Sequence, residues 1–228
     1  MKKVLLIISF FCSVASQAQE LKLVPQISVT GEGKIKAVPD QVFISIAVET
    51  KGTNATDVKK QNDATIEKVL QFITKFKVPK SDVQTKSISL NPQYDYEKKK
   101  RNYNATQTIE ILLKTITQYD GLMEGLVDAG INRINGVEFK TSKLIEYQSE
   151  ARKLAMKEAK LKAEDYVFVL GQKVGKAITI TDNTQNFYPQ PMYAMKTMAM
   201  DQEVATRETL AIGEINITAT VNVSFLLE

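Results

Sequence analysis

The chain has 228 residues, of which 43% are hydrophobic, with a formal net charge of +4, one cysteine and no histidine. A chain of this length forms one or two globular domains. The small net charge disfavours an electrostatic nucleic-acid binder, and the lack of histidine removes the commonest catalytic base and a principal zinc ligand.

The N-terminus has the pattern of a secretory signal peptide. Two lysines precede an apolar run at residues 4–15, and small residues follow it. The run is shorter than the roughly 20 residues that cross a bilayer. We expect cleavage between Ala18 and Gln19, which removes residues 1–18 together with the only cysteine. The sequence therefore predicts an exported single domain at 19–228, without disulfides and without a transmembrane segment.

The mature chain begins with two predicted strands and a helix. Apolar and polar residues alternate over 27–37 and again over 42–48, as in half-buried strands. Gly31 and Gly33 interrupt the first alternation, which indicates a bulge or a close approach of another backbone. A helical period follows from Asn54, a suitable N-cap, to about Phe76.

A second unit of the same kind comes next. A hairpin is predicted from strands at about 82–94 and 109–113, followed by a short helix at 119–129 that ends at Gly130. The polar stretch after this helix resumes as a strand at Val137, so we interpret it as a joint between helix and strand, not a catalytic loop. Its polar and glycine residues are Asn132, Arg133, Asn135 and Gly136. From residue 41 to 142 the predicted order is β-α-β-β-α-β, the ferredoxin-like order.

The C-terminal part is predicted to contain one long helix and two further strands. The helix runs over 145–170, and the strands run over 174–181 and 215–225. The predicted apolar stripe of the helix consists of Ala151, Leu154, Ala155, Ala159, Ala163, Tyr166, Val167 and Leu170. A long Met-rich loop, at about 183–208, separates the two strands, and loops of this length are functional or disordered. The predicted class is α+β, with a mostly antiparallel sheet.

Five motifs in this order resemble the bacterial SIMPL-domain family, which includes periplasmic immunogenic proteins. They are VTGEGKIKAVPDQVFISIAVET, NPQYDY, AGINRINGVEF, ARKLAMKEAKLKAEDYVFVLG and GEINITATVNVSF. The resemblance covers about residues 27–225 and implies an α+β fold, a periplasmic location and, in some members, large homo-oligomers and a link to oxidative stress. It implies no catalytic residues. The basic segment 98–101 departs from what the family leads us to expect.

The residues supply few parts for catalysis. Gly31 and Gly33 lack the third glycine and the following helix of a dinucleotide loop. The mature chain has no cysteine nucleophile and no histidine base. Carboxylates such as Glu158 and Glu164 lie on a polar helix face, where water keeps their pKa near the ordinary value, so they are poor general acids. We expect a non-enzymatic protein with no cofactor and no catalytic residues.

The Met-rich loop carries the one candidate metal site. Its thioethers, which are credible Cu(I) ligands, belong to Met192, Met195, Met198 and Met200. The alternatives are that the loop packs against a partner subunit, that it is disordered, or that its methionines are reversibly oxidised and scavenge oxidant.

The basic hairpin tip at 98–101 lies near Tyr94, Tyr96 and Tyr103. It could contact anionic lipid or another protein, or it could simply be solvated.

Together these features predict an exported, non-enzymatic envelope protein that self-assembles and contributes to stress tolerance or envelope integrity. The long helix, the polar face of the last strand and the Met-rich loop are the expected contact surfaces. The alternative is a periplasmic binding module, for Cu(I) through the Met-rich loop or for a protein partner through the hairpin tip. We expect no nucleic-acid partner.

Overall fold

The computed structural model describes residues 24–97, 99–184, 191–192 and 210–228. The predicted signal peptide, residues 1–18, and most of the Met-rich loop lie outside the described residues. In chain order the helices and strands are β1 (Gln26–Ala37), β2 (Gln41–Gly52), α2 (Ala55–Lys75), β3 (Val83–Asp95), β4 (Lys100–Leu113), α3 (Tyr119–Ala129), β5 (Arg133–Lys140), α4 (Leu144–Val169), β6 (Val174–Asp182), β7 (Pro191–Met192) and β8 (Glu214–Leu227). Short 3-10 turns at Lys80–Asp82 and Ile116–Gln118 precede β3 and α3. The predicted α+β class is confirmed.

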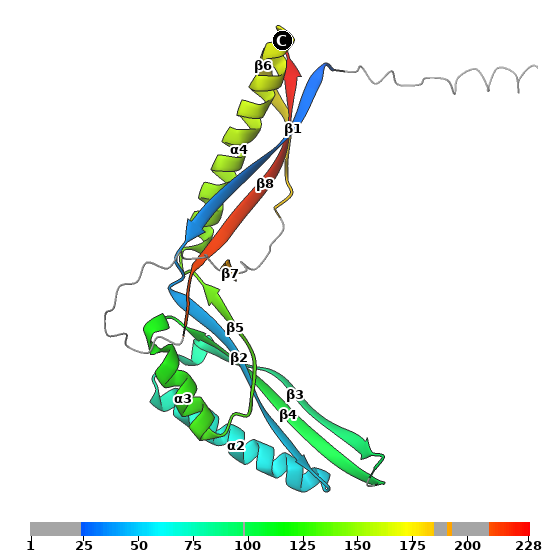
Figure 1. The fold of residues 1–228 in the computed structure, drawn as a ribbon, viewed down its shortest axis with the longest axis vertical. Helices are drawn as coiled ribbons and strands as arrows, with labels where there is room; N and C mark the ends of the chain where they lie inside the picture. Colours follow the sequence, from blue (N-terminus) through cyan, green and yellow to red (C-terminus); the bar gives the residue numbers. More distant parts are fainter. Residues whose placement is uncertain (1–23, 98, 185–190, 193–209) are drawn as a thin grey trace, which may run out of the picture.

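The strands form two separate antiparallel sheets, one toward each end of the molecule (Figure 1). The terminal sheet has the order β1-β8-β6, with the two-residue β7 paired to β8, and the central sheet has the order β3-β4-β2-β5. From β2 to β5 the elements follow one another as strand, helix, strand, strand, helix and strand. We expected one sheet, but β1 pairs over its whole length with β8, from Gln26 opposite Leu226 to Ala37 opposite Ile215.

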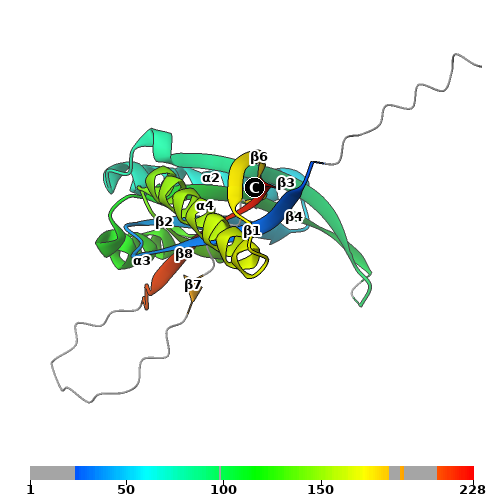
Figure 2. The same ribbon diagram turned by 90° about the horizontal axis from the view of Figure 1, so that it is seen from above.

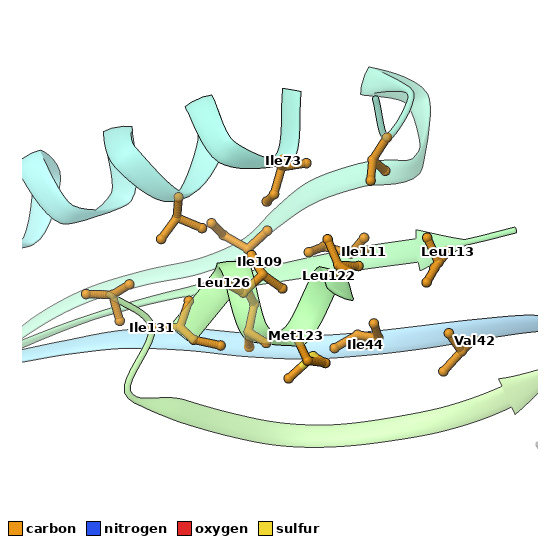
Figure 3. Close-up of a cluster of buried hydrophobic side chains, with 14 of the residues drawn as sticks. Val42, Ile44, Ile73, Ile109, Ile111, Leu113, Leu122, Met123, Leu126 and Ile131 are labelled. Carbon is orange, nitrogen blue, oxygen red and sulfur yellow. The ribbon is translucent and has the colours of Figure 1, made fainter. Parts of the chain in front are cut away.

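The central sheet is covered by α2 and α3, which enclose the larger core (Figure 3). In β2 and β4 buried residues alternate with less buried ones, so that every second side chain points at the helices, and the side chains on this buried face are mostly aliphatic. The fully buried members include Val42, Ile44, Val69, Ile109, Ile111, Leu122 and Leu126. Helix α2 begins where predicted, since the Asn54 side chain accepts hydrogen bonds from the backbone N–H of Thr56 (2.8 Å) and Asp57 (3.3 Å).

Helix α4 lies along the terminal sheet (Figures 1 and 2). Its buried residues are Ala151, Ala155, Ala159, Ala163 and Val167, which recur every four positions. They pack on Val29 of β1 and on Val221 and Val223 of β8. With 26 residues, the helix is about 39 Å long at 1.5 Å per residue.

Gly31 and Gly33 allow this helix to approach β1 closely. A Cβ atom at Gly31 would lie 2.0 Å from the carbonyl oxygen of Ala155, and one at Gly33 would lie 1.9 Å from that of Ala151. The β1–β8 register runs through both glycines without a shift. Of the two structures we considered for this segment, the close backbone approach is confirmed, and the bulge is wrong.

Asp40 connects the two chain crossings between the sheets. Its carboxylate accepts hydrogen bonds from the backbone N–H (2.7 Å) and the hydroxyl (2.5 Å) of Ser142, and its own N–H donates to the Lys140 carbonyl (3.1 Å). Partial burial opposes ionisation of Asp40, but the Ser142 hydrogen bonds outweigh it, so the pKa of Asp40 is lowered. These bonds tie the β1–β2 connection to the β5–α4 connection.

Candidate functional site

The C-terminal end of α4 carries an apolar patch that the fold leaves exposed. Phe168 and Val169 are each 83% exposed, and Leu170 is 72% exposed. We call this surface the α4 end patch, and it consists of the exposed residues Tyr166, Phe168, Val169 and Leu170. Large apolar side chains gathered in this way mark interaction surfaces more often than singly exposed ones do.

This patch corrects part of the predicted helix stripe. Leu154, Tyr166 and Leu170 were expected on the buried face, but they are 42%, 61% and 72% exposed. The residues buried against the sheet are spaced by four, and four of these five are alanines because β1 approaches the helix closely; Met156 is partly buried beside them. Leu154, Tyr166 and Leu170 therefore point elsewhere.

Polar side chains of α4 cover part of the β1 edge of the terminal sheet. Strand β1 is an edge strand, and its outward backbone groups meet two α4 side chains. Glu158 accepts a hydrogen bond from the N–H of Glu32, and Lys162 donates to the carbonyl of Thr30 (3.1 Å). The two side chains also form an ion pair (3.1 Å). An edge capped in this way is a poor template for pairing with another chain.

The stretch after α3 is a structural joint in the described residues. Gly130 has φ 111° and ends the helix in the left-handed conformation. The Asn132 side chain accepts from the N–H of Glu49 (2.8 Å) and donates to the carbonyl of Glu49 (2.7 Å), as a strand partner would. Lys51 (2.9 Å) and Arg133 (3.7 Å) surround the Glu49 carboxylate, and the hydrogen bond from Lys51 lowers its pKa most.

An open groove runs beside α2. It has a volume of about 740 Å³ and is lined by Ile66, Leu70 and Thr74 of α2 and by Gln107 of β4, with acidic side chains at one end. The groove arises because α2 packs on β2 and β4. The neighbouring edge strand β3 is mostly exposed as a result.

The expectation that water keeps the pKa of Glu158 near its ordinary value is wrong. The pKa of Glu158 is lowered, chiefly by the hydrogen bond from the Glu32 backbone and then by Lys162. A lowered pKa makes this group a weaker general acid at neutral pH. Among the described residues no group of three His, Cys, Asp or Glu side chains could hold a metal ion.

The predicted copper ligands fall largely outside the structure that is described. Met192 belongs to β7, where its backbone pairs with Glu214 of β8. Met195, Met198 and Met200 lie outside the described residues. The Cu(I) site therefore stays a prediction.

Comparison with known proteins identifies the family of this chain. A family model described as "SIMPL: Protein of unknown function (DUF541)" matches residues 27–225. The chain belongs to the SIMPL family. It is 29% identical over 218 residues to "Uncharacterized protein YggE" of Escherichia coli K12, an alignment that covers 94% of this chain and 88% of that protein. It is 27% identical over 232 residues to "26 kDa periplasmic immunogenic protein" of Brucella melitensis, covering 93% and 90%.

Two surfaces of this SIMPL protein therefore stand out, the α4 end patch and the uncovered β3 side of the central sheet. The long helix α4 was an expected contact surface, but the patch was not predicted, since helical periodicity alone placed Leu170 in the core stripe. The run Tyr166–Leu170 nonetheless contains more apolar residues than a narrow helix stripe can bury, and this excess of apolar residues indicates an exposed patch. No helix in the described parts of the chain is long and apolar enough to cross a membrane.

Proposed function

We propose that this protein is an exported, periplasmic, non-enzymatic component of the cell envelope. In this proposal it self-assembles through the α4 end patch and so contributes to stress tolerance or envelope integrity. The observation that carries the proposal is the exposure of three successive apolar residues, Phe168, Val169 and Leu170, at one end of a long rigid helix. The name of the Brucella relative supports the periplasmic location.

The energetics of the patch favour association. Full burial of one large apolar side chain stabilises by about 1.5–3 kcal/mol. Burial of Phe168 and Val169 against another subunit would then contribute about 3–6 kcal/mol, before the entropy cost of association. Small residues and the sheet occupy the opposite face of α4, so these side chains have no partner among the described residues of their own chain.

Light scattering behind size exclusion tests the proposal on the mature protein at micromolar concentration. The wild type is expected to elute at several times the monomer mass, and Phe168→Ser/Val169→Ser is expected to elute as a monomer or to dissociate at least about 100-fold more readily. Ile145→Ser is the matched control, because Ile145 is 81% exposed at the other end of the same helix. A monomeric wild type, or an equal effect of Ile145→Ser, would contradict assembly through this patch.

The stress role has its own test. A strain that produces only the Phe168→Ser/Val169→Ser protein should tolerate peroxide less well than a strain with the wild type or with Ile145→Ser. Equal survival of all three strains would show that stress tolerance does not depend on assembly through this patch.

The second candidate function is Cu(I) binding, which the four methionines within residues 192–200 support. The mature protein would then withdraw Cu(I) from a chromogenic chelator, and the variant with all four changed to Leu would not. Equal copper uptake by both proteins would exclude the Met-rich loop as the site.

A further inference from the structure

The outer half of the β3–β4 hairpin is amphipathic. We call this part, residues 87–97 and 99–108, the hairpin arm. On one face the β3 residues are apolar or aromatic, namely Ile88, Leu90, Pro92 and Tyr94, which lie opposite Gln107, Ala105, Tyr103 and Arg101 of β4. On the other face every cross-strand pair is polar, namely Ser89 with Thr106, Asn91 with Asn104, Gln93 with Asn102 and Asp95 with Lys100. Successive residues of a strand point to opposite faces, so this alternation separates the two surfaces.

The β3 side of the apolar face is exposed, whereas Ala105 and Gln107 of β4, on the same face, are buried. Ile88 is 60% exposed, Leu90 40% and Tyr94 49%, while Tyr96 at the turn is 84% exposed. The rings of Tyr94 and Tyr96 meet edge to face, with centroids 5.0 Å apart, so the two aromatics form one surface. The arm ends at the periphery of the molecule in both views, where nothing described covers it (Figures 1 and 2).

The tip of the arm is basic. Lys99, Lys100 and Arg101 are exposed, and the sequence adds Lys98, against the two acids Asp95 and Glu97. Lys99 has φ 49°, in the left-handed region that favours glycine. A lysine therefore occupies a turn position that a glycine would adopt more easily, which keeps an additional positive charge at the tip.

We propose that the hairpin arm docks on a membrane surface that contains anionic phospholipid. Tyrosine side chains partition to the headgroup level of a bilayer, where the ring is buried and the hydroxyl stays wet. Lys99, Lys100 and Arg101 then lie beside the lipid phosphates. The positive charge of the tip favours a negatively charged bilayer as the binding partner. Because the arm protrudes, a flat membrane surface can contact its tip.

The expected contribution of each basic residue to membrane binding follows from its charge. Each basic residue near an anionic membrane strengthens binding about fivefold, so neutralising three should weaken it about 100-fold. Salt should weaken it too, because exposed charges are screened within about 8 Å at physiological ionic strength.

The experiment is co-sedimentation of the mature protein with vesicles of phosphatidylglycerol and phosphatidylcholine, and with vesicles of phosphatidylcholine alone. The wild type should bind the anionic vesicles and not the neutral ones, and binding should fall in 0.5 M salt. Lys99→Gln/Lys100→Gln/Arg101→Gln should bind about 100-fold more weakly, and Tyr94→Ser/Tyr96→Ser should also bind more weakly at unchanged charge. These side chains are exposed, so thermal unfolding should stay as in the wild type.

The matched control removes the same charges from α4. Arg152→Gln/Lys153→Gln/Lys157→Gln neutralises one arginine and two lysines on an exposed helix face and should bind as the wild type does. Three results would overturn the proposal: no binding of the wild type to anionic vesicles, equal weakening by the α4 control, or full competition by inorganic phosphate at constant ionic strength. The last result would point to free phosphate as the ligand.

Discussion

Replacement of Gly31 by alanine should separate α4 from the terminal sheet. The added Cβ would lie 2.0 Å from the Ala155 oxygen, 2.6 Å from the Ala159 nitrogen and 2.8 Å from the Ala159 Cβ. Two of these three atoms belong to the helix backbone, which cannot rotate away. To restore a separation of 3.0 Å, the helix must move outward by about 1 Å, and it then loses contact along its alanine stripe.

The expected cost is about 2 kcal/mol of unfolding free energy. Overpacking of a close-packed interior costs about 1–3 kcal/mol, and the rigid backbone contact puts Gly31→Ala at the upper end. The lower entropy of the unfolded alanine chain offsets about 0.4–1 kcal/mol. With a urea dependence of about 2 kcal/mol per molar, the midpoint should fall by about 1 M.

Urea unfolding followed by far-UV circular dichroism measures this change. Gly136→Ala is the matched control, because nothing lies within 4 Å of its added Cβ, and it should change stability by less than about 0.5 kcal/mol. Ala159→Gly should not rescue Gly31→Ala, since it removes only the 2.8 Å contact and leaves the backbone clashes. An unchanged midpoint for Gly31→Ala would refute the close approach of helix and strand.

Three further substitutions test the local contacts. Asn54→Ala should lower the unfolding free energy by about 1 kcal/mol, because α2 loses its N-cap, and Asn54→Ser should recover most of it in the same urea assay. Asn132→Asp should destabilise by about 1–3 kcal/mol, since a carboxylate cannot donate to the Glu49 carbonyl. If the variant is as stable as the wild type, this hydrogen bond does not stabilise the joint. Glu158→Gln should destabilise at neutral pH, and its difference in stability from the wild type should shrink as the pH falls through the folded pKa of Glu158. The folded pKa of Glu158 is below its ordinary 4.5, so the stability it contributes is present above that value and is lost as the pH falls through the folded pKa. A difference between wild type and Glu158→Gln that does not change with pH would contradict the Glu32 hydrogen bond.

The α4 end patch and the hairpin arm lie toward opposite ends of the molecule (Figure 1). Self-assembly through one surface would therefore leave the other free for a membrane. The two proposals have separate variants and separate readouts, so either can fail without the other. If both hold, the assembled protein would present many basic hairpin tips to the same bilayer, and the binding would strengthen through multivalency.

Local patterns determined most of the secondary structure of this protein. The caps at Asn54 and Gly130 and the alternation in β2 and β8 were readable from the sequence, because each depends on neighbours a few residues apart. The tertiary structure alone decided that β1 pairs with β8, nearly 200 residues away, and that the strands divide into two sheets. It also decided which apolar residues are exposed. Periodicity shows that Leu170 and Ile88 belong to apolar faces. Whether such a face is covered depends on elements that are distant in the sequence. For Leu170 this is the narrow contact between β1 and α4, and for Ile88 it is the part of the central sheet that α2 covers.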